Sequence, residues 1–120
     1  MSIVAVRGAV TLDHGTDEGT LMVDAVGRLF RILSESNNFI PEDVISIQLT
    51  QTPDLHRKNA ATALREAVDE YHDIPLFCSQ EPAVEGSLPR TVRTLVTLRG
   101  KGPVKPVYLG EAADLRPDLS

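Results

Sequence analysis

Hydrophobic residues recur along this chain with two periods, one typical of strands and one typical of helices. Apolar runs rich in β-branched residues predict five strands, at residues 2–10, 44–51, 74–79, 91–99 and 105–110. Apolar positions three and four apart predict two helices, from Thr16 to about Ser36 and from the end of the loop at residues 52–56 to about Tyr71. We therefore expect one domain over residues 1–120, of the mixed α/β (α+β) class: a mixed five-stranded sheet with two helices on one face.

Local signals predict where both helices begin. Thr16 is the expected N-cap of the first helix, because Asp17 and Glu18 follow it and acidic side chains favour the first turn of a helix. In the loop TPDLH, residues 52–56, Asp54 is the expected cap of the second helix.

The predicted strands carry more apolar surface than two helices can cover. VISI and IPLF, at residues 44–47 and 74–77, are apolar on both faces of a strand. Helices on one side of the sheet leave the other side uncovered, and large exposed apolar patches usually mark contacts between proteins. We therefore expect other copies of this chain to cover the second face, as in a homo-oligomer.

Composition and charge narrow the class of protein and its partners. Of 120 residues, 42% are hydrophobic and 4% aromatic, which is ordinary for a globular domain whose core is aliphatic. A formal net charge of −5 argues against nucleic acid or an acidic membrane as a partner. The single cysteine, Cys78, fits a reducing compartment, and neither a signal peptide nor a membrane-spanning apolar run is present. These observations predict a cytoplasmic protein.

Two arginines interrupt predicted strands in the middle. Alternation places Arg93 on the same strand face as Leu95, and Arg7 likewise shares a strand face with apolar neighbours. A guanidinium is costly to desolvate without an anion, so each arginine is either an exposed charge on an edge strand or a ligand for an anion. Glu81, just after the third strand, is either a solvated loop carboxylate or the salt-bridge partner of one arginine.

The chain offers few groups for covalent or metal chemistry. Cys78 has no histidine at a spacing that suggests a catalytic pair, so a small buried core residue is its simpler interpretation. His14, His56 and His72 form no metal-ligand pattern, and no glycine-rich phosphate-binding motif occurs. We expect no metal and no cofactor. Many arginines and few nucleophiles suit binding of an anionic small molecule, or a reaction that needs only positioning and charge stabilisation.

Six segments, taken in order, resemble one known family. They are VRGAVT (6–11), TPDLH (52–56), ALREAV (63–68), CSQE (78–81), EGSLPRTVR (85–93) and VYLGEAADLRPDLS (107–120). In this combination the chain resembles the AroH-class chorismate mutases along nearly its whole length. The resemblance implies an isomerase that converts chorismate to prephenate on the route to phenylalanine and tyrosine. It also implies a pseudo-barrel homotrimer with a RidA-like fold and active sites between subunits.

The same resemblance implies roles for individual residues around the substrate. Arg93 would hydrogen-bond the ether oxygen of chorismate, while Arg7 and Tyr108 would hold the enolpyruvyl carboxylate. Glu81 and the segment around Cys78 would contact the ring hydroxyl.

Two further arginines and two departures from the family concern the rim of the site. Arg65 would close the pocket from the neighbouring subunit, and Arg116 in the tail would lie at its mouth. The family usually has an aromatic residue and a lysine where this chain has Asn59 and Thr62, so we expect a more open or wetter pocket wall. The loop at residues 99–106 is also shorter than usual.

Two other functions remain open at this stage. A RidA-like imine hydrolase would explain Arg93 but not the joint presence of Arg7, Glu81 and Tyr108. A non-catalytic trimer that binds a small molecule, such as a degenerate mutase, would explain the unusual Asn59 and Thr62.

Overall fold

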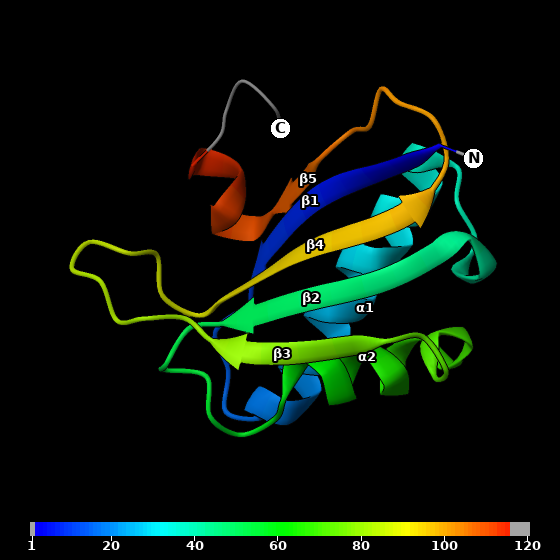
Figure 1. Ribbon diagram of the computed structural model, residues 1–120. Coiled ribbons are helices and arrows are strands. Elements are labelled where there is room, and N and C mark those ends of the chain that lie inside the picture. Colours follow the sequence, from blue (N-terminus) through cyan, green and yellow to red (C-terminus); the bar gives the residue numbers. More distant parts are fainter. Residues whose placement is uncertain (1, 116–120) are drawn as a thin grey trace.

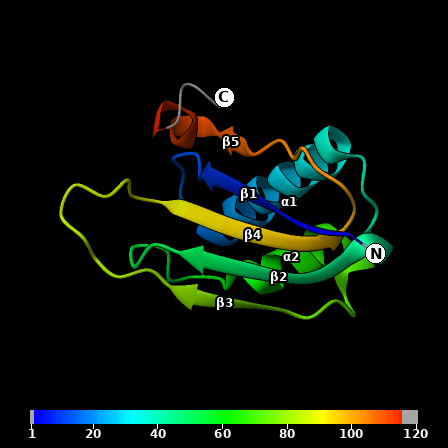
Figure 2. The ribbon, with the colours of Figure 1, turned by 45° about the horizontal axis from the view of Figure 1, so that its top comes forward.

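The computed structural model describes residues 2–115, which form one mixed sheet packed against two helices. The strand order across the sheet is β3-β2-β4-β1-β5, with β4 antiparallel to both of its neighbours and the two edge strands parallel to theirs. Figure 1 shows this order, and Figure 2 shows both helices behind the sheet. The elements are β1 (Ile3–Thr11), α1 (Glu18–Asn37), η1 (Pro41–Asp43), β2 (Val44–Gln51), α2 (Ala60–Ala67), η2 (Asp69–Tyr71), β3 (Leu76–Gln80), β4 (Thr91–Arg99), β5 (Val107–Leu109) and η3 (Gly110–Leu115).

The core lies between the sheet and the helices, and it follows the predicted alternation. On β4, Val92, Val96 and Leu98 are buried, whereas Leu95 is exposed. The apolar faces of α1 and α2 pack on the same side of the sheet, including Phe30 and Leu64. The predicted mixed sheet with two helices on one face is therefore confirmed.

Both predicted helix caps are wrong. Asp17, not Thr16, caps α1, and its carboxylate accepts hydrogen bonds from the Thr20 amide at 3.2 Å and the Thr20 hydroxyl at 2.8 Å. These contacts lower the pKa of Asp17, because they stabilise the charged form. The shift of one residue has a simple cause: Thr16 and Asp17 are adjacent and both can cap, and the longer acidic side chain accepts two hydrogen bonds.

At the second helix the cap is Asn59, whose side-chain oxygen accepts a hydrogen bond from the Ala61 amide at 2.8 Å. Asp54 instead accepts a hydrogen bond at 2.9 Å from the backbone of Arg90, 36 residues away. α2 also ends at Ala67, and residues up to Tyr71 continue as a separate 3₁₀ turn. The Asp54 carboxylate, which the local sequence predicted to cap α2, is thus bonded to the distant Arg90 backbone instead.

None of the helices in residues 2–115 lies over the second face of the sheet. Phe77 on β3 is 60% exposed and Leu95 on β4 is 37% exposed, and Ile3 on β1 is exposed as well. Within the described residues, no helix is both long and apolar enough to cross a membrane.

Candidate active site

The uncovered face of the sheet places Arg93 and Tyr108, two of the predicted site residues, in one row. The strand register places Tyr108 beside Ala9, Ala9 beside Arg93, Arg93 beside Thr50, and Thr50 beside Ser79. Residues paired in this way project from the same face of a sheet. This row crosses all five strands, so residues that are far apart in the sequence share one strip of surface.

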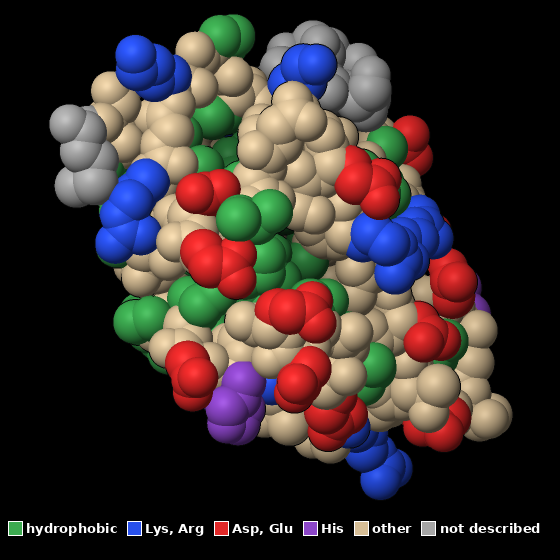
Figure 3. Space-filling model, turned by 90° about the vertical axis from the view of Figure 1, so that its right-hand side faces the viewer, with side chains coloured by type: hydrophobic (Ala, Val, Ile, Leu, Met, Phe, Trp, Pro, Cys, Tyr) green, Lys and Arg blue, Asp and Glu red, His purple; other side chains and the backbone are tan. Residues whose placement is uncertain are grey.

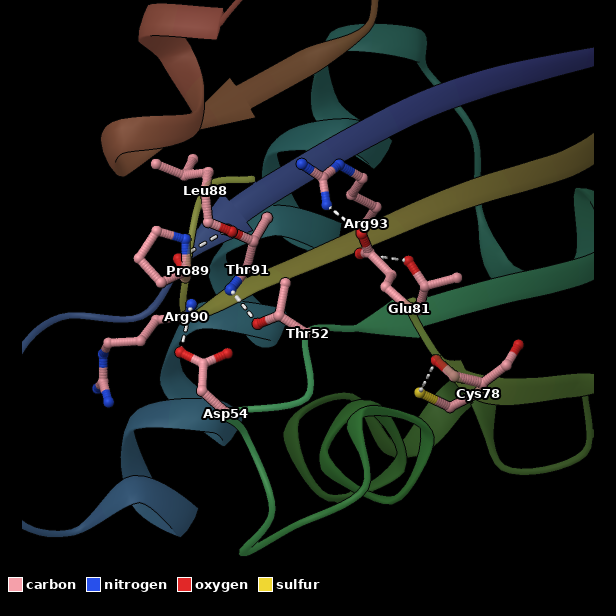
Figure 4. Close-up of polar contacts among 11 residues, drawn as sticks. Thr52, Asp54, Cys78, Glu81, Leu88, Pro89, Arg90, Thr91 and Arg93 are labelled. Atoms are coloured by element: carbon pink, nitrogen blue, oxygen red, sulfur yellow. Dashed lines mark hydrogen bonds and ion pairs between the residues drawn. The ribbon is translucent and has the colours of Figure 1, made fainter. Parts of the chain in front are cut away.

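An ion pair with a hydrogen-bonded partner occupies the middle of the row. The Arg93 Nη1 atom lies 2.5 Å from Glu81 Oε1, and the Thr50 hydroxyl donates to Glu81 Oε2 at 2.8 Å (Figure 4). The side chains of Arg93 and Glu81 are 35% and 18% exposed, so the pair is only partly shielded from solvent. The sequence left Glu81 as either a solvated loop carboxylate or a salt-bridge partner of an arginine, and in the structure it is the salt-bridge partner of Arg93.

Arg7 lies in the next row of the same face and adds a second positive charge. Its register partner on β4 is Leu95, two residues from Arg93, and the Arg7 side chain is exposed. Diagonal neighbours of this kind are roughly 7–8 Å apart, which is close enough for both guanidinium groups to contact one small anion. Figure 3 shows acidic side chains spread over another part of the surface, at the end of the sheet near η1 and η2. The acidic net charge therefore does not prevent a local excess of positive charge on this strip.

Known proteins match the chain over its whole length. The family model "Chorismate mutase type I" matches residues 3–119. Chorismate mutase AroH of Bacillus subtilis (strain 168) is 37% identical over 123 aligned residues, which cover 100% of this chain and 94% of the relative. The chain belongs to the type I chorismate mutase family. The prediction of family and isomerase activity made from the six segments is therefore confirmed.

A second relative and a solved structure agree with this assignment. Chorismate mutase AroH of Thermus thermophilus is 36% identical over 118 residues, or 95% of this chain and 93% of the relative. A chorismate mutase structure from Clostridium thermocellum superposes with a TM-score of 0.83 at 30% identity, covering 92% of this chain and 98% of that chain. The type I chorismate mutase fold is thus supported by sequence and structure together.

Cys78 does not present its thiol on the strip that holds Arg93. It pairs with Leu49, whose side chain is buried under the helices, and its Sγ lies 3.2 Å from Gln51 Oε1. Figure 4 shows the Cys78 side chain apart from the Arg93–Glu81 pair. Burial raises the pKa of the Cys78 thiol, because the thiolate would lose solvation. Cys78 is thus a half-buried thiol rather than an activated nucleophile. Among the described residues, no group of His, Cys, Asp and Glu side chains is arranged to hold a metal ion.

Three other predicted site residues lie on the helix side of the sheet. Asn59, Thr62 and Arg65 belong to α2 and its cap, so the sheet separates them from Arg93 of the same chain. Asn59 and Cys78 line a cleft of about 340 Å³ at the β3 edge, whereas Glu81 lines a different cleft of about 380 Å³ under the loop at residues 82–89. The chain therefore carries two sets of predicted residues that do not meet within the single chain. Arg116 lies outside the described residues.

Sequence reasoning missed two polar side chains that hold this region together. Thr50 orients Glu81, and the Gln51 amide donates to the carbonyls of Leu55 and Lys58 at 2.9 and 3.2 Å while accepting from the Ala60 amide at 2.8 Å. Both residues sit in an ordinary strand pattern. No local signal in the sequence distinguishes them from other polar strand residues, because their partners come from distant segments.

Proposed function

We propose that this member of the chorismate mutase family binds chorismate on the strip around Arg93 and rearranges it to prephenate without a covalent intermediate. The observation that carries the proposal is the Arg93–Glu81–Thr50 arrangement, which holds one end of a guanidinium on the face of the sheet that the described helices do not cover. Arginine has five N–H donors, and Glu81 uses the Nη1 end. Arg93 is therefore an oriented donor rather than a freely rotating surface charge.

The proposed chemistry needs a cation at the ether oxygen of the substrate. As the C–O bond breaks ahead of C–C bond formation, negative charge grows on that oxygen, and the free donors of Arg93 stabilise it. A positioned donor of this kind is typically worth a factor of roughly 10²–10³ in rate. Since the rearrangement is unimolecular and moves no proton, it requires no nucleophile or base.

Arg7 and Tyr108 are proposed to hold the substrate's carboxylate and its compact reactive conformer. Tyr108 and Arg93 flank Ala9 from opposite sides, so their backbones are two strand spacings, or about 10 Å, apart. That span suits a small dianion held at both ends. Glu81 and the segment around Cys78 are proposed to contact the ring hydroxyl, since a carboxylate can accept more than the two hydrogen bonds that Glu81 already accepts.

We further propose that the complete site forms between subunits of a homotrimer. The exposed Phe77 and Leu95 supply apolar surface for subunit contact on the uncovered face. Asn59, Thr62 and Arg65 belong to α2 and its cap, on the helix side of the sheet, and are proposed to lie at the site of a neighbouring subunit. Arg116 is proposed to contribute at the mouth, and a cytoplasmic location remains a prediction from the sequence.

The decisive experiment follows the loss of chorismate absorbance with the purified protein, with prephenate identified as the product. Arg93→Ala is measured alongside it, and the molecular mass in solution is measured by light scattering. Saturable turnover that disappears in the variant, from a trimer, supports the proposal. Binding of chorismate without turnover would favour the non-catalytic binder, and hydrolysis of an imine without prephenate formation would favour the RidA-like alternative.

A further inference from the structure

Thr50 is the side chain that fixes the orientation of the Glu81 carboxylate. Its hydroxyl donates to Oε2 at 2.8 Å, while Oε1 accepts from Arg93 Nη1. The Glu81 backbone amide also donates to the Gln51 carbonyl at 2.9 Å, which fixes the start of the same side chain. The carboxylate is therefore held at both oxygens and at its backbone.

These contacts also restrain Arg93, because Thr50 and Arg93 are direct register partners on β2 and β4 and both bond the Glu81 carboxylate. A carboxylate with only one partner rotates about its terminal torsion, which is broad and has no sharp minimum. With the Thr50 hydroxyl in place, the Glu81 oxygen that meets Arg93 has a defined position. That position restrains the Nη1 end of the guanidinium, and so limits the directions in which its other donors can lie.

We propose that Thr50 is a positioning residue for the mutase reaction, acting on Arg93 through Glu81. This inference rests on the proposed roles of Arg93 and Glu81. Thr50 itself sets how well Arg93 is aimed at the position where charge develops. A small displacement of a positioned group can cost up to about 100-fold in rate, so losing the hydroxyl acts mainly on kcat.

The chain contains a matched control on the neighbouring strand. Thr94 is buried on the opposite face of β4, and its hydroxyl donates at 2.9 Å to the Gln48 carbonyl. Thr94→Val also removes one hydroxyl hydrogen bond from the middle of the sheet, but it leaves Glu81 and Arg93 untouched. Any effect that results only from a weakened sheet will thus appear in both variants.

The test compares kcat, KM and thermal stability of Thr50→Val, Thr50→Ser and Thr94→Val with those of the unmodified protein. We expect Thr50→Val to lower kcat roughly 10- to 100-fold with little change in KM. Thr50→Ser, which keeps the hydroxyl, should recover most of that loss. Thr94→Val should lower the melting temperature but leave kcat within about twofold.

A double-mutant comparison then tests the route through Glu81. In a Glu81→Ala background, Thr50→Val should have no further effect on kcat, because the group that it orients is gone. An additive effect, or equal kcat losses in Thr50→Val and Thr94→Val, would overturn the inference while leaving the proposed function intact. An unmodified protein that does not convert chorismate would instead overturn the proposed function and this inference together.

Discussion

Tyr108 and Arg93 are joined through a single residue, since both are register partners of Ala9 on β1. Tyr108 approaches Ala9 from the parallel edge strand β5, and Arg93 approaches it from the antiparallel strand β4 (Figure 1). The separation of the phenol and the guanidinium is therefore set by two rigid strand spacings rather than by a loop. A site built on such a frame can hold both ends of a small anion without rearrangement.

Replacing Arg93 by lysine should impair catalysis far more than folding. Lysine keeps the positive charge but loses the planar fork that bonds Glu81 and is proposed to bond the substrate at the same time. We expect kcat to fall by roughly 10²–10³, with a small change in melting temperature because the side chain is partly exposed. Steady-state kinetics and thermal unfolding of the same preparation check this. An unfolded variant with normal activity per folded molecule would make Arg93 a purely structural ion-pair partner.

Gly27 should not tolerate even a methyl group. A Cβ atom built on it would stand 2.9 Å from the Cβ of Ala67, where α1 crosses α2. Gly27→Ala should therefore destabilise the protein by about 1–3 kcal/mol, since the overlap outweighs the gain in helix propensity. Urea unfolding measures the difference in the free energy of unfolding.

Gly19, in the first turn of the same helix, is the control. A Cβ atom there meets nothing closer than 3.5 Å, so Gly19→Ala should be neutral or stabilise the protein by up to about 1 kcal/mol. Equal effects of the two substitutions would show that the contact between α1 and α2 is looser than described.

Stability should fall at high pH because of Tyr71. Burial raises the pKa of Tyr71 from its usual 10.0 to about 12, and its ring packs edge-on against Phe30. Between these two values the unfolded chain releases the phenolic proton while the folded chain retains it. Stability from this group is thus complete below about pH 10 and is lost as the pH rises toward 12, by about 2–3 kcal/mol at most.

Tyr71→Phe keeps the ring and removes the titrating group, so it isolates that contribution. Urea unfolding of both proteins from pH 8 to pH 11.5 should show the gap between their stabilities changing only above pH 10. A gap that is constant over this range would mean that Tyr71 ionises in the folded state as easily as in the unfolded state.

Cys78 should react slowly with thiol reagents in the folded protein. Its Sγ is half-buried, lies against the Gln51 amide, and has a raised pKa, so little thiolate is present near neutral pH. At pH 8 we expect an aromatic disulfide reagent to react roughly tenfold more slowly with the native protein than with the protein in guanidinium chloride. Equal rates would contradict both the burial and the direction of the pKa shift.

Much of this fold could be predicted because it depends on local patterns. Alternation along β1 and β4 identified which residues face the helices, and apolar spacing along α1 identified its buried stripe. The six collinear segments predicted the family and, with it, the candidate site residues. A periodic pattern reports which face is buried, since burial of apolar side chains is the dominant driving force for folding.

Only the tertiary structure decided which polar groups meet. Asp54 does not cap α2 as predicted, because its carboxylate accepts a hydrogen bond from the Arg90 backbone, and Asn59 caps the helix instead. Thr50 bonds the Glu81 carboxylate because β2 and β3 are neighbouring strands. Hydrogen bonds are short and directional, so a partner is chosen by the three-dimensional register of strands rather than by distance along the chain. The sequence by itself therefore determined the layers and the candidate arginines, whereas strand pairing determined how Arg93 is held.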